Sequence, residues 1–199
     1  MTKLTNLRGF EDAVHDAQGT FRSLLDANAQ PGTPCLLTAS MTAPSGLTAA
    51  CAAACLTLLD LDVEVWVQPS FASPVRNWLL FHTGCRFTQQ PGEADFAVIG
   101  DLAGLPELSD FNWGTTEQPE ASTTLMVQIE SWQGGQPVVL TGPGILDRQE
   151  IAPNLPRHFW DFWVKNHQAY PQGVDVLLFT ENAVMGLPRT AKSEFCYQP

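Results

Sequence analysis

Apolar residues recur at helical spacing near the start of the chain, which predicts an amphipathic helix over about residues 11–28. Pro31-Gly32 follows and is typical of a helix end. A second helix is expected from an N-cap at Ser45 through Leu59, because alanine dominates this segment. Two more helices are expected, one opened by Ser73-Pro74 and reaching about residue 81, and an aromatic-rich one over about residues 157–170.

Alternating and continuous apolar runs lie between these helices and predict strands. The segments 125–131 and 138–141 are expected to pair as a hairpin across Gly134-Gly135. A second hairpin is expected to turn at Glu181-Asn182. The remaining runs read as strands are residues 35–37, 63–67 and 96–99, and the second hairpin joins residues 174–179 to 183–187.

The interleaving of helices and strands favours a layered fold. The sequence predicts an α/β protein: a single three-layer α/β/α domain with a mixed sheet. A length of 199 residues fits one domain, and no linker marks a boundary inside it. The domain is therefore expected to span residues 1–199, with about 1–9 and 191–199 as peripheral tails.

Charge and cysteine content narrow the class of protein. The formal net charge is −11 and no Lys/Arg cluster is present, which argues against a nucleic-acid binder. Five cysteines without framework spacing indicate free thiols in a reducing compartment. The longest weakly polar run, residues 47–59, is too short to cross a membrane. A soluble, cytoplasmic protein with no membrane contact is expected.

Histidine and arginine side chains supply the first candidates for chemistry. His15 lies three residues after Asp12, so the two could meet on one helix face as a surface or capping network. His82 follows a predicted helix and Arg86 comes shortly after it, and both are candidate ligand-binding residues. For Arg86, a structural anchor or a subunit interface is the alternative. His82 and Cys85 could form half of a metal site, but no second ligand pair accompanies them, so no metal is expected.

A glycine-containing loop and a late arginine complete the candidate ligand site. Gly142 and Gly144 follow an apolar strand and could let backbone N–H groups approach a phosphate. Pro143 removes one such donor, and a tight turn is the alternative for this loop. Arg189 could clamp a carboxylate or phosphate, or else anchor the C-terminal segment or a subunit interface.

Aromatic and lysine residues bear on partners and cofactors. Trp160 and Trp163 lie one helical turn apart and are the candidate subunit contact. The three lysines lie at positions 3, 165 and 192. None falls in a mid-chain loop after a strand, where a Schiff-base lysine would be expected, so no cofactor is predicted.

Six short segments are spread along the chain. They are Val14-His15-Asp16-Ala17-Gln18 with Phe21-Arg22 and Pro31-Gly32, Thr57-Leu58-Leu59-Asp60, Phe81-His82-Thr83, Ala94-Asp95-Phe96-Ala97, Thr141-Gly142-Pro143-Gly144-Ile145 and Pro188-Arg189-Thr190. In this order and spacing they resemble the PhnH subunit family of the bacterial carbon–phosphorus lyase system. The resemblance runs from about Phe10 to Arg189, and it is specific because all six segments occur together. A Pro-Glu-x-Gly-Ala-type segment usual in the family is replaced here by residues 119–123.

The resemblance implies a fold similar to the major domain of pyridoxal-phosphate-dependent transferases, without that cofactor. It also implies a homodimer that joins PhnG, PhnI and PhnJ subunits in a core complex for alkylphosphonate use. That complex forms ribose 1-phosphonate 5-triphosphate from ATP and phosphonate, upstream of C–P cleavage. Within it, a structural or site-completing role is expected. Two alternatives stay open: an enzyme component that binds a nucleotide or phosphonate, and a metabolite-sensing regulator.

Overall fold

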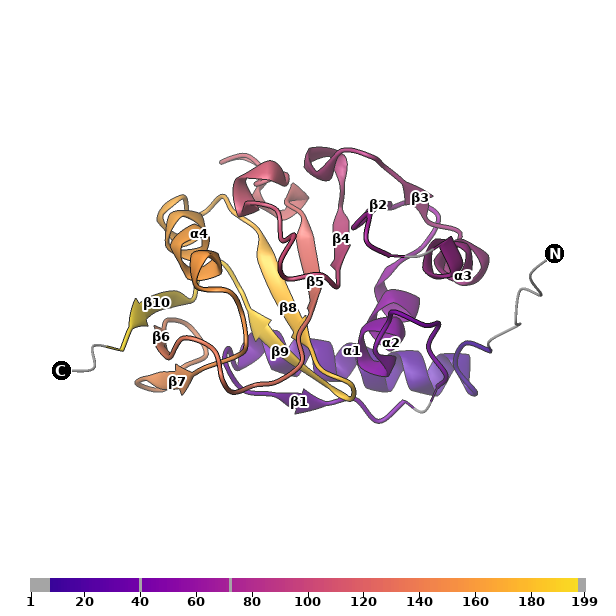
Figure 1. The fold of residues 1–199 in the computed structure, drawn as a ribbon, viewed down its shortest axis with the longest axis horizontal. Coiled ribbons are helices and arrows are strands. Elements are labelled where there is room, and N and C mark those ends of the chain that lie inside the picture. The colour runs from indigo at the N-terminus through magenta and orange to yellow at the C-terminus, as the bar shows by residue number, and fades with distance from the viewer. Residues whose placement is uncertain (1–7, 40, 72, 197–199) are drawn as a thin grey trace.

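The computed structural model describes residues 8–39, 41–71 and 73–196 and shows a mixed α/β fold (Figure 1). Its four α-helices lie close to the predicted positions. They are α1 (Ala13–Ala29), α2 (Ala49–Leu58), α3 (Ser73–Thr83) and α4 (Arg157–Gln168). The strands are β1 (Cys35–Leu36), β2 (Glu64–Val67), β3 (Arg86–Phe87), β4 (Phe96–Ile99), β5 (Thr124–Gln128), β6 (Val138–Thr141), β7 (Gln149–Ile151), β8 (Asp175–Phe179), β9 (Ala183–Leu187) and β10 (Lys192–Phe195).

The first two helices begin at side-chain caps. Asp12 caps α1, and its carboxylate accepts hydrogen bonds from the backbone N–H groups of Val14 and His15. The cap of α2 is Thr48, whose hydroxyl accepts from the Cys51 N–H at 3.2 Å. The prediction of Ser45 as the α2 cap is therefore wrong. Residues 44–47 form a turn that is closed by the Leu47 N–H bonded to the Pro44 carbonyl, and the helix starts only after it.

A seven-stranded mixed sheet forms the centre of the molecule, in the order β1-β9-β8-β5-β4-β2-β3. Strands β8, β5, β4, β2 and β3 run parallel, whereas β9 is antiparallel to both of its neighbours. The hairpin of β8 and β9 is confirmed, with Phe179 paired to Val184.

Helices cover both faces of this sheet, and each face has its own hydrophobic core. Leu24, Ala53 and Leu79, from α1, α2 and α3, belong to one buried cluster with Met126 of β5. The other cluster joins α4 to the opposite side chains of the same strands, with Leu125 as one example. Successive residues of β5 point to opposite faces, so a fully buried strand serves both cores.

The predicted hairpin of residues 125–131 and 138–141 is wrong. Strand β5 lies inside the large sheet between β4 and β8, while β6 belongs to a separate three-stranded sheet in the order β10-β6-β7. Strand β5 is buried almost throughout, as a parallel central strand must be, whereas alternate residues of β6 are less buried. The intervening residues 129–137 connect the two sheets rather than forming a tight turn.

Within the described residues 191–196, most of the expected C-terminal tail is a strand. Strand β10 pairs antiparallel with β6, placing Lys192 opposite Thr141 and Phe195 opposite Val138. Ala191, just before it, is fully buried. Of the expected N-terminal tail, only residues 8 and 9 are within the described part. Gly9 there lies against the side chains of His82 and Leu56.

Trp160 and Trp163 are core residues, which corrects their prediction as a subunit contact. Both are fully buried within the chain, so neither presents a surface to a partner. The Trp163 indole stacks on Phe159 at 6.0 Å between ring centroids and donates its N–H to the Ala191 carbonyl at 3.0 Å. The aromatic stripe of α4 is therefore the face that the helix buries against the sheet.

Candidate functional site

A hollow with a volume of about 680 Å³ lies at the carboxyl ends of β4 and β5. The crossover from β2 to β3 contains α3 on one face of the sheet, while residues between β4 and β5 contribute to the core on the other face. From β2 the chain continues to β3 at one edge of the sheet, then returns to β4 on the other side of β2 and goes on to β5. The strand order therefore reverses between the neighbours β2 and β4. Open α/β sheets place ligand sites at such a switch point, outside the carboxyl ends of the strands, and this hollow lies next to it, at the ends of β4 and β5.

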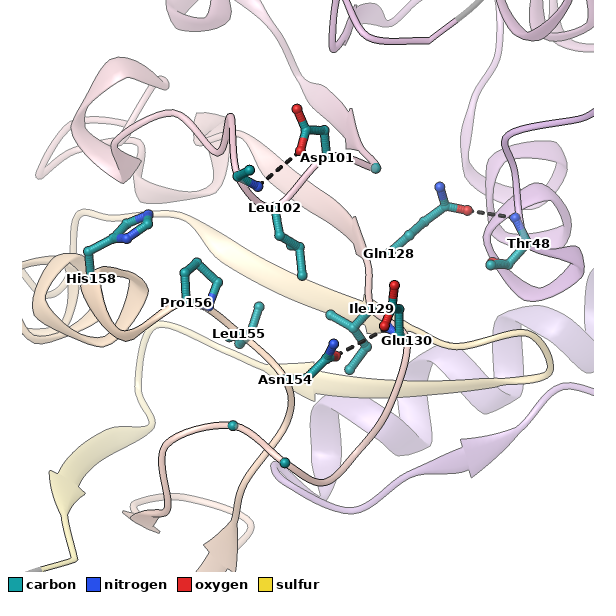
Figure 2. Close-up of a pocket in the computed structure, with 14 residues that line it drawn as sticks. Thr48, Asp101, Leu102, Gln128, Ile129, Glu130, Asn154, Leu155, Pro156 and His158 are labelled. Carbon is teal, nitrogen blue, oxygen red and sulfur yellow. Dashed lines mark hydrogen bonds between the residues drawn. The ribbon is translucent and has the colours of Figure 1, made fainter.

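Two glutamines at strand ends hold the loops that line this cleft, and one of them, Gln128, also lines it. The buried Gln68, just after β2, accepts hydrogen bonds from the N–H groups of Gly100 and Asp101. Its amide nitrogen donates to the Asp101 and Gly104 carbonyls, at 2.9 and 3.0 Å. Gln128, the last residue of β5, likewise accepts from the Thr48 N–H and donates to the Gly46 carbonyl (Figure 2). Both amides are thus used to hold loops.

The N-terminus of α2 meets the cleft at Thr48, but its backbone donors are largely committed. The Thr48 N–H binds Gln128, the Ala50 N–H binds the Glu181 carbonyl, and the Cys51 N–H binds the Thr48 hydroxyl. A helix start attracts anions through unpaired N–H groups. With these three donors occupied, the start of α2 lacks most of the groups that would bind a phosphate.

Charged side chains make the cleft acidic. Asp101 follows β4 and Glu130 follows β5, and the only basic side chain in the lining is that of His158, at the start of α4. Figure 2 shows Asn154 between Glu130 and the residues leading to α4. Its side-chain oxygen accepts from the Glu130 and Ser131 N–H groups. A cleft of this kind suits ammonium, guanidinium or hydroxyl groups better than it suits a polyanion.

The described residues contain no cluster of three or more His, Cys, Asp or Glu side chains that could hold a metal ion. The two lysines among them, Lys165 and Lys192, do not line the cleft. Lys165 lies over the Phe162 ring, and Lys192 pairs with Glu194. Among the residues that the structure describes, the cleft therefore presents no amine with which a carbonyl cofactor could form a Schiff base.

The geometry favours Arg189 as a structural anchor over Arg189 as a clamp for a ligand carboxylate or phosphate. Its Nε and Nη2 donate to the Asp175 carboxylate, at 3.2 and 2.6 Å. Nη1 donates to the Pro119 and Pro171 carbonyls, and Nη2 also donates to the Ser122 hydroxyl. A guanidinium has five N–H groups, and these contacts use all five. The hollow beside it, about 340 Å³, therefore gains no free donor from Arg189.

The glycines of the predicted phosphate loop lie against the chain's own backbone. A Cβ at Gly142 would approach the Thr190 carbonyl to 2.8 Å, and one at Gly144 would come within 2.2 Å of the Ala29 carbonyl. Both have positive φ angles, of 138° and 82°. The Ile145 N–H closes the turn on the Gly142 carbonyl. These glycines thus permit a tight turn packed on α1 and β10, the alternative to a phosphate cradle.

His82 and Arg86 lie at the edge of the sheet, away from both hollows. His82 is in the last turn of α3 and contacts the rings of Trp78 and Phe81. Arg86 is in edge strand β3 and donates to the Glu64 carboxylate and the Asp62 carbonyl, both at 2.8 Å. Neither residue lines the cleft at β4 and β5. The five predicted ligand residues therefore do not converge on one site.

Comparison with known proteins identifies the family. The model of the family described as "Bacterial phosphonate metabolism protein (PhnH)" matches residues 8–194 of this chain. The chain belongs to the PhnH family. A relative from Rhizobium meliloti (strain 1021), "Alpha-D-ribose 1-methylphosphonate 5-triphosphate synthase subunit PhnH", is 42% identical over 187 residues, covering 93% of this chain and 94% of the relative. The "Putative C-P lyase subunit protein HtxG" of Stutzerimonas stutzeri is 31% identical over 99 residues, covering 49% and 50%.

None of the residues that line the cleft is among the ligand-binding residues predicted from the sequence of this PhnH-family chain. A usable pattern was nevertheless present, because Asp101 and Gln128 each come at or just after the end of a buried apolar run. Polar residues that follow parallel strands meet at one edge of the sheet. Applying that rule to residues 96–99 and 125–128 would have placed both at one site. His158 precedes an aromatic helix and offered no such pattern.

Proposed function

We propose that this chain is a subunit of an assembly that makes α-D-ribose 1-methylphosphonate 5-triphosphate, as part of phosphonate breakdown by the carbon–phosphorus lyase route. The observation that carries the proposal is the 42% identity to a PhnH subunit of that synthase over 94% of the relative's length. The partners proposed are a second copy of this chain and PhnG-, PhnI- and PhnJ-type subunits, in the cytoplasm. In the described residues, no helix is long and apolar enough to span a membrane.

Within this assembly, the chain organises partners or completes a site rather than performing chemistry alone. Support comes from the cleft, where the side chains of Gln128 and Asn154 are occupied in holding loops, as is that of Gln68 behind its lining. The proposed fold is that of a pyridoxal-phosphate-dependent transferase major domain that does not use the cofactor. The parallel strands and the cleft at their carboxyl ends are compatible with that fold, and the described lysines lie elsewhere.

Reconstitution tests the proposal. This chain is co-expressed with PhnG, PhnI and PhnJ of its own organism, and the product is analysed by size-exclusion chromatography and native mass spectrometry. A complex that contains this chain is expected, and omission of the chain should reduce synthesis of the ribose 1-phosphonate product from ATP and methylphosphonate. Turnover by the isolated chain would contradict the organising role. An assembly that excludes this chain and keeps full activity would contradict the subunit assignment.

A further inference from the structure

The cleft at the carboxyl ends of β4 and β5 combines an apolar floor with a polar rim (Figure 2). Ile129 and Leu155 are at most 5% exposed and belong to the hydrophobic core on that face of the sheet, and Leu102 packs against the same core. Binding sites for small organic molecules are concave, measure about 300–1,000 Å³ and are lined mainly by apolar groups with a few polar ones. At about 680 Å³, this cleft has the size and the lining of such a site.

Two carboxylates of the rim follow adjacent strand ends and have acceptor oxygens to offer. Ile99 of β4 pairs with Val127 of β5, so Asp101 and Glu130 come shortly after neighbouring ends of the parallel ladder. Asp101 uses one carboxylate oxygen to accept the Ala103 N–H at 3.0 Å. Within the part of the chain that the structure describes, no hydrogen bond or ion pair uses the Glu130 carboxylate.

The basic residues near the cleft do not neutralise these carboxylates. Among the described residues, no lysine or arginine lines it, and Arg157 at the start of α4 lies over the Phe195 ring of β10 instead. Figure 2 shows His158 and Glu130 on opposite sides of the hollow, with Pro156 between them. The positive end of the α4 dipole is on the His158 side as well. The cleft therefore has one negative end, and that end has no cation of its own.

This lining fits an organic cation better than a metal ion or a polyanion. Ca²⁺ takes about six to eight oxygen ligands, and two carboxylates supply few of them. The same carboxylates repel a polyanion. An organic cation pairs its charged head with a carboxylate, and its carbon chain covers the apolar floor. A guanidinium is well suited, because it binds a carboxylate through two parallel N–H bonds and is less strongly hydrated than an ammonium.

We propose that the cleft binds a small organic cation, a guanidinium or primary amine on a short carbon chain. The charged head lies at Asp101 and Glu130, and the chain lies on Leu102, Ile129 and Leu155. The start of α4 disfavours the reverse orientation, because it would bring like charges together. This site goes beyond the proposed subunit role and does not depend on it. The same chemistry is found in free amines and in an arginine side chain of a partner protein.

A charged probe and its neutral counterpart test the site. Butylguanidinium is the probe, and butylurea has nearly the same shape without the charge. In the isotope-labelled full-length chain, butylguanidinium should bind with a dissociation constant of about 1 mM or lower. It should shift the backbone amide signals of Gly100, Leu102, Gly134 and Gly135, which line the cleft. Butylurea should bind at least about tenfold more weakly, because it lacks the attraction to the carboxylates.

The length of the carbon chain tests the apolar floor. In a series from methylguanidinium to butylguanidinium, each added methylene should tighten binding by up to about fourfold, because it removes more of the floor from water. The same titrations measure this effect. An affinity that does not depend on chain length would contradict the placement of the chain on Leu102, Ile129 and Leu155.

Neutral variants test the two carboxylates. Asp101→Asn/Glu130→Gln should weaken butylguanidinium binding by at least about tenfold. The fold should survive, because asparagine keeps the oxygen that accepts from the Ala103 N–H. Glu11→Gln/Glu117→Gln is the matched control, since it removes two exposed carboxylates outside the cleft and changes the net charge equally. It should bind the probe as the unmodified chain does.

Three results would overturn the proposal. They are equal binding of butylguanidinium and butylurea, no shift of the cleft amides up to about 10 mM probe, and equal weakening in the cleft variant and its control. The first two concern the unmodified chain, so they apply even where a variant fails to fold.

Reconstitution with PhnG, PhnI and PhnJ separates the two sources of the cation. A free amine is the ligand if the assembled complex still binds the probe and the Asp101→Asn/Glu130→Gln variant assembles normally. A partner's arginine is the ligand if assembly displaces the probe and the variant assembles poorly. Both results support the site. A chain that binds the probe but never joins these subunits would overturn the subunit assignment alone.

Discussion

Arg189 donates every guanidinium N–H to its own chain, so its value to the protein lies in stability. Only 12% of its side chain is exposed, and Asp175 beside it is 30% exposed. Arg189→Ala should lower the free energy of unfolding by about 2–4 kcal/mol, because the carboxylate and two carbonyls lose their donors. Urea denaturation measures the change. Arg86→Ala, at an exposed pair, should cost no more than about 1 kcal/mol.

Equal costs at the two arginines would contradict this account of Arg189. So would a folded Arg189→Ala variant with unchanged stability that had lost affinity for ATP. That second result would return Arg189 to the ligand site that its position after a strand had suggested.

Asp12 gives the start of α1 a dependence on pH. The backbone N–H and then the side chain of His15 hold the pKa of this carboxyl below its ordinary value of 3.8. A group whose pKa is lowered by folding stabilises the native state above its unfolded pKa, and the effect is lost as pH falls through the lowered value. Asp12→Asn keeps a capping oxygen but no charge.

The Asp12→Asn variant should therefore melt at a lower temperature than the unmodified chain at pH 7, and the gap should close as pH falls below 3.8. Thermal melts at a series of pH values measure both. A gap of the same size at pH 7 and at pH 2 would show that the charge contributes nothing.

At the scale of elements, helix α1 lies unusually close to strand β9 because of a glycine. A Cβ at Gly186 of β9 would come within 2.5 Å of the Ala27 carbonyl of α1. Gly186→Ala should therefore push the helix away and cost about 1–3 kcal/mol. Gly19, in the same helix, has no atom within 4 Å of such a Cβ, so Gly19→Ala should stabilise by up to about 1 kcal/mol.

Chemical denaturation of the two variants compares the two effects. Opposite signs are expected. Destabilisation by Gly19→Ala, or no effect of Gly186→Ala, would mean that close backbone contact does not set the distance between α1 and β9.

The sequence predicted elements whose partners are close along the chain and failed where pairing is distant. The β8–β9 hairpin follows from two apolar runs separated by three residues, 180–182. The segments at 125 and 138 offered the same local pattern, yet their partners are β4, β8, β7 and β10. Nothing in a local window distinguishes these cases, because tertiary burial decides between them. Likewise, Trp160 and Trp163 form an apolar helix face, and the sequence alone does not tell whether this face packs on the chain's own sheet or on another subunit.

At the scale of the whole molecule, ligand sites depend on which strand ends meet. His82, Arg86, Gly142, Gly144 and Arg189 each had a suitable residue type. The fold separates them, since Arg86 is on edge strand β3 and Gly142 is beside the second sheet. Strand order is a property of the assembled sheet, so a polar residue after an apolar run marks a strand end in the sequence, while the topology decides which strand ends meet in the cleft beside β4 and β5.

The acidic balance of the molecule and of its cleft leads to a last prediction. The net charge is −11, and the cleft has Asp101 and Glu130 against a single His158. The negative charges of a nucleotide triphosphate would meet a repulsive field there. The N–H groups at the start of α2 that could offset this repulsion are already hydrogen-bonded within the chain. The isolated chain should therefore bind ATP more weakly than about 1 mM, with or without Mg²⁺.

Isothermal titration measures this affinity, and neutralising variants show its cause. Asp101→Asn/Glu130→Gln should bind ATP somewhat more tightly than the unmodified chain, because two like charges are removed. Arg86→Ala, far from the cleft, should change nothing. Micromolar binding that the neutralising variant abolishes would contradict this prediction and make the two carboxylates part of a nucleotide site. Binding weaker than about 1 mM would agree with the proposed organising role, in which the partner subunits recognise the nucleotide.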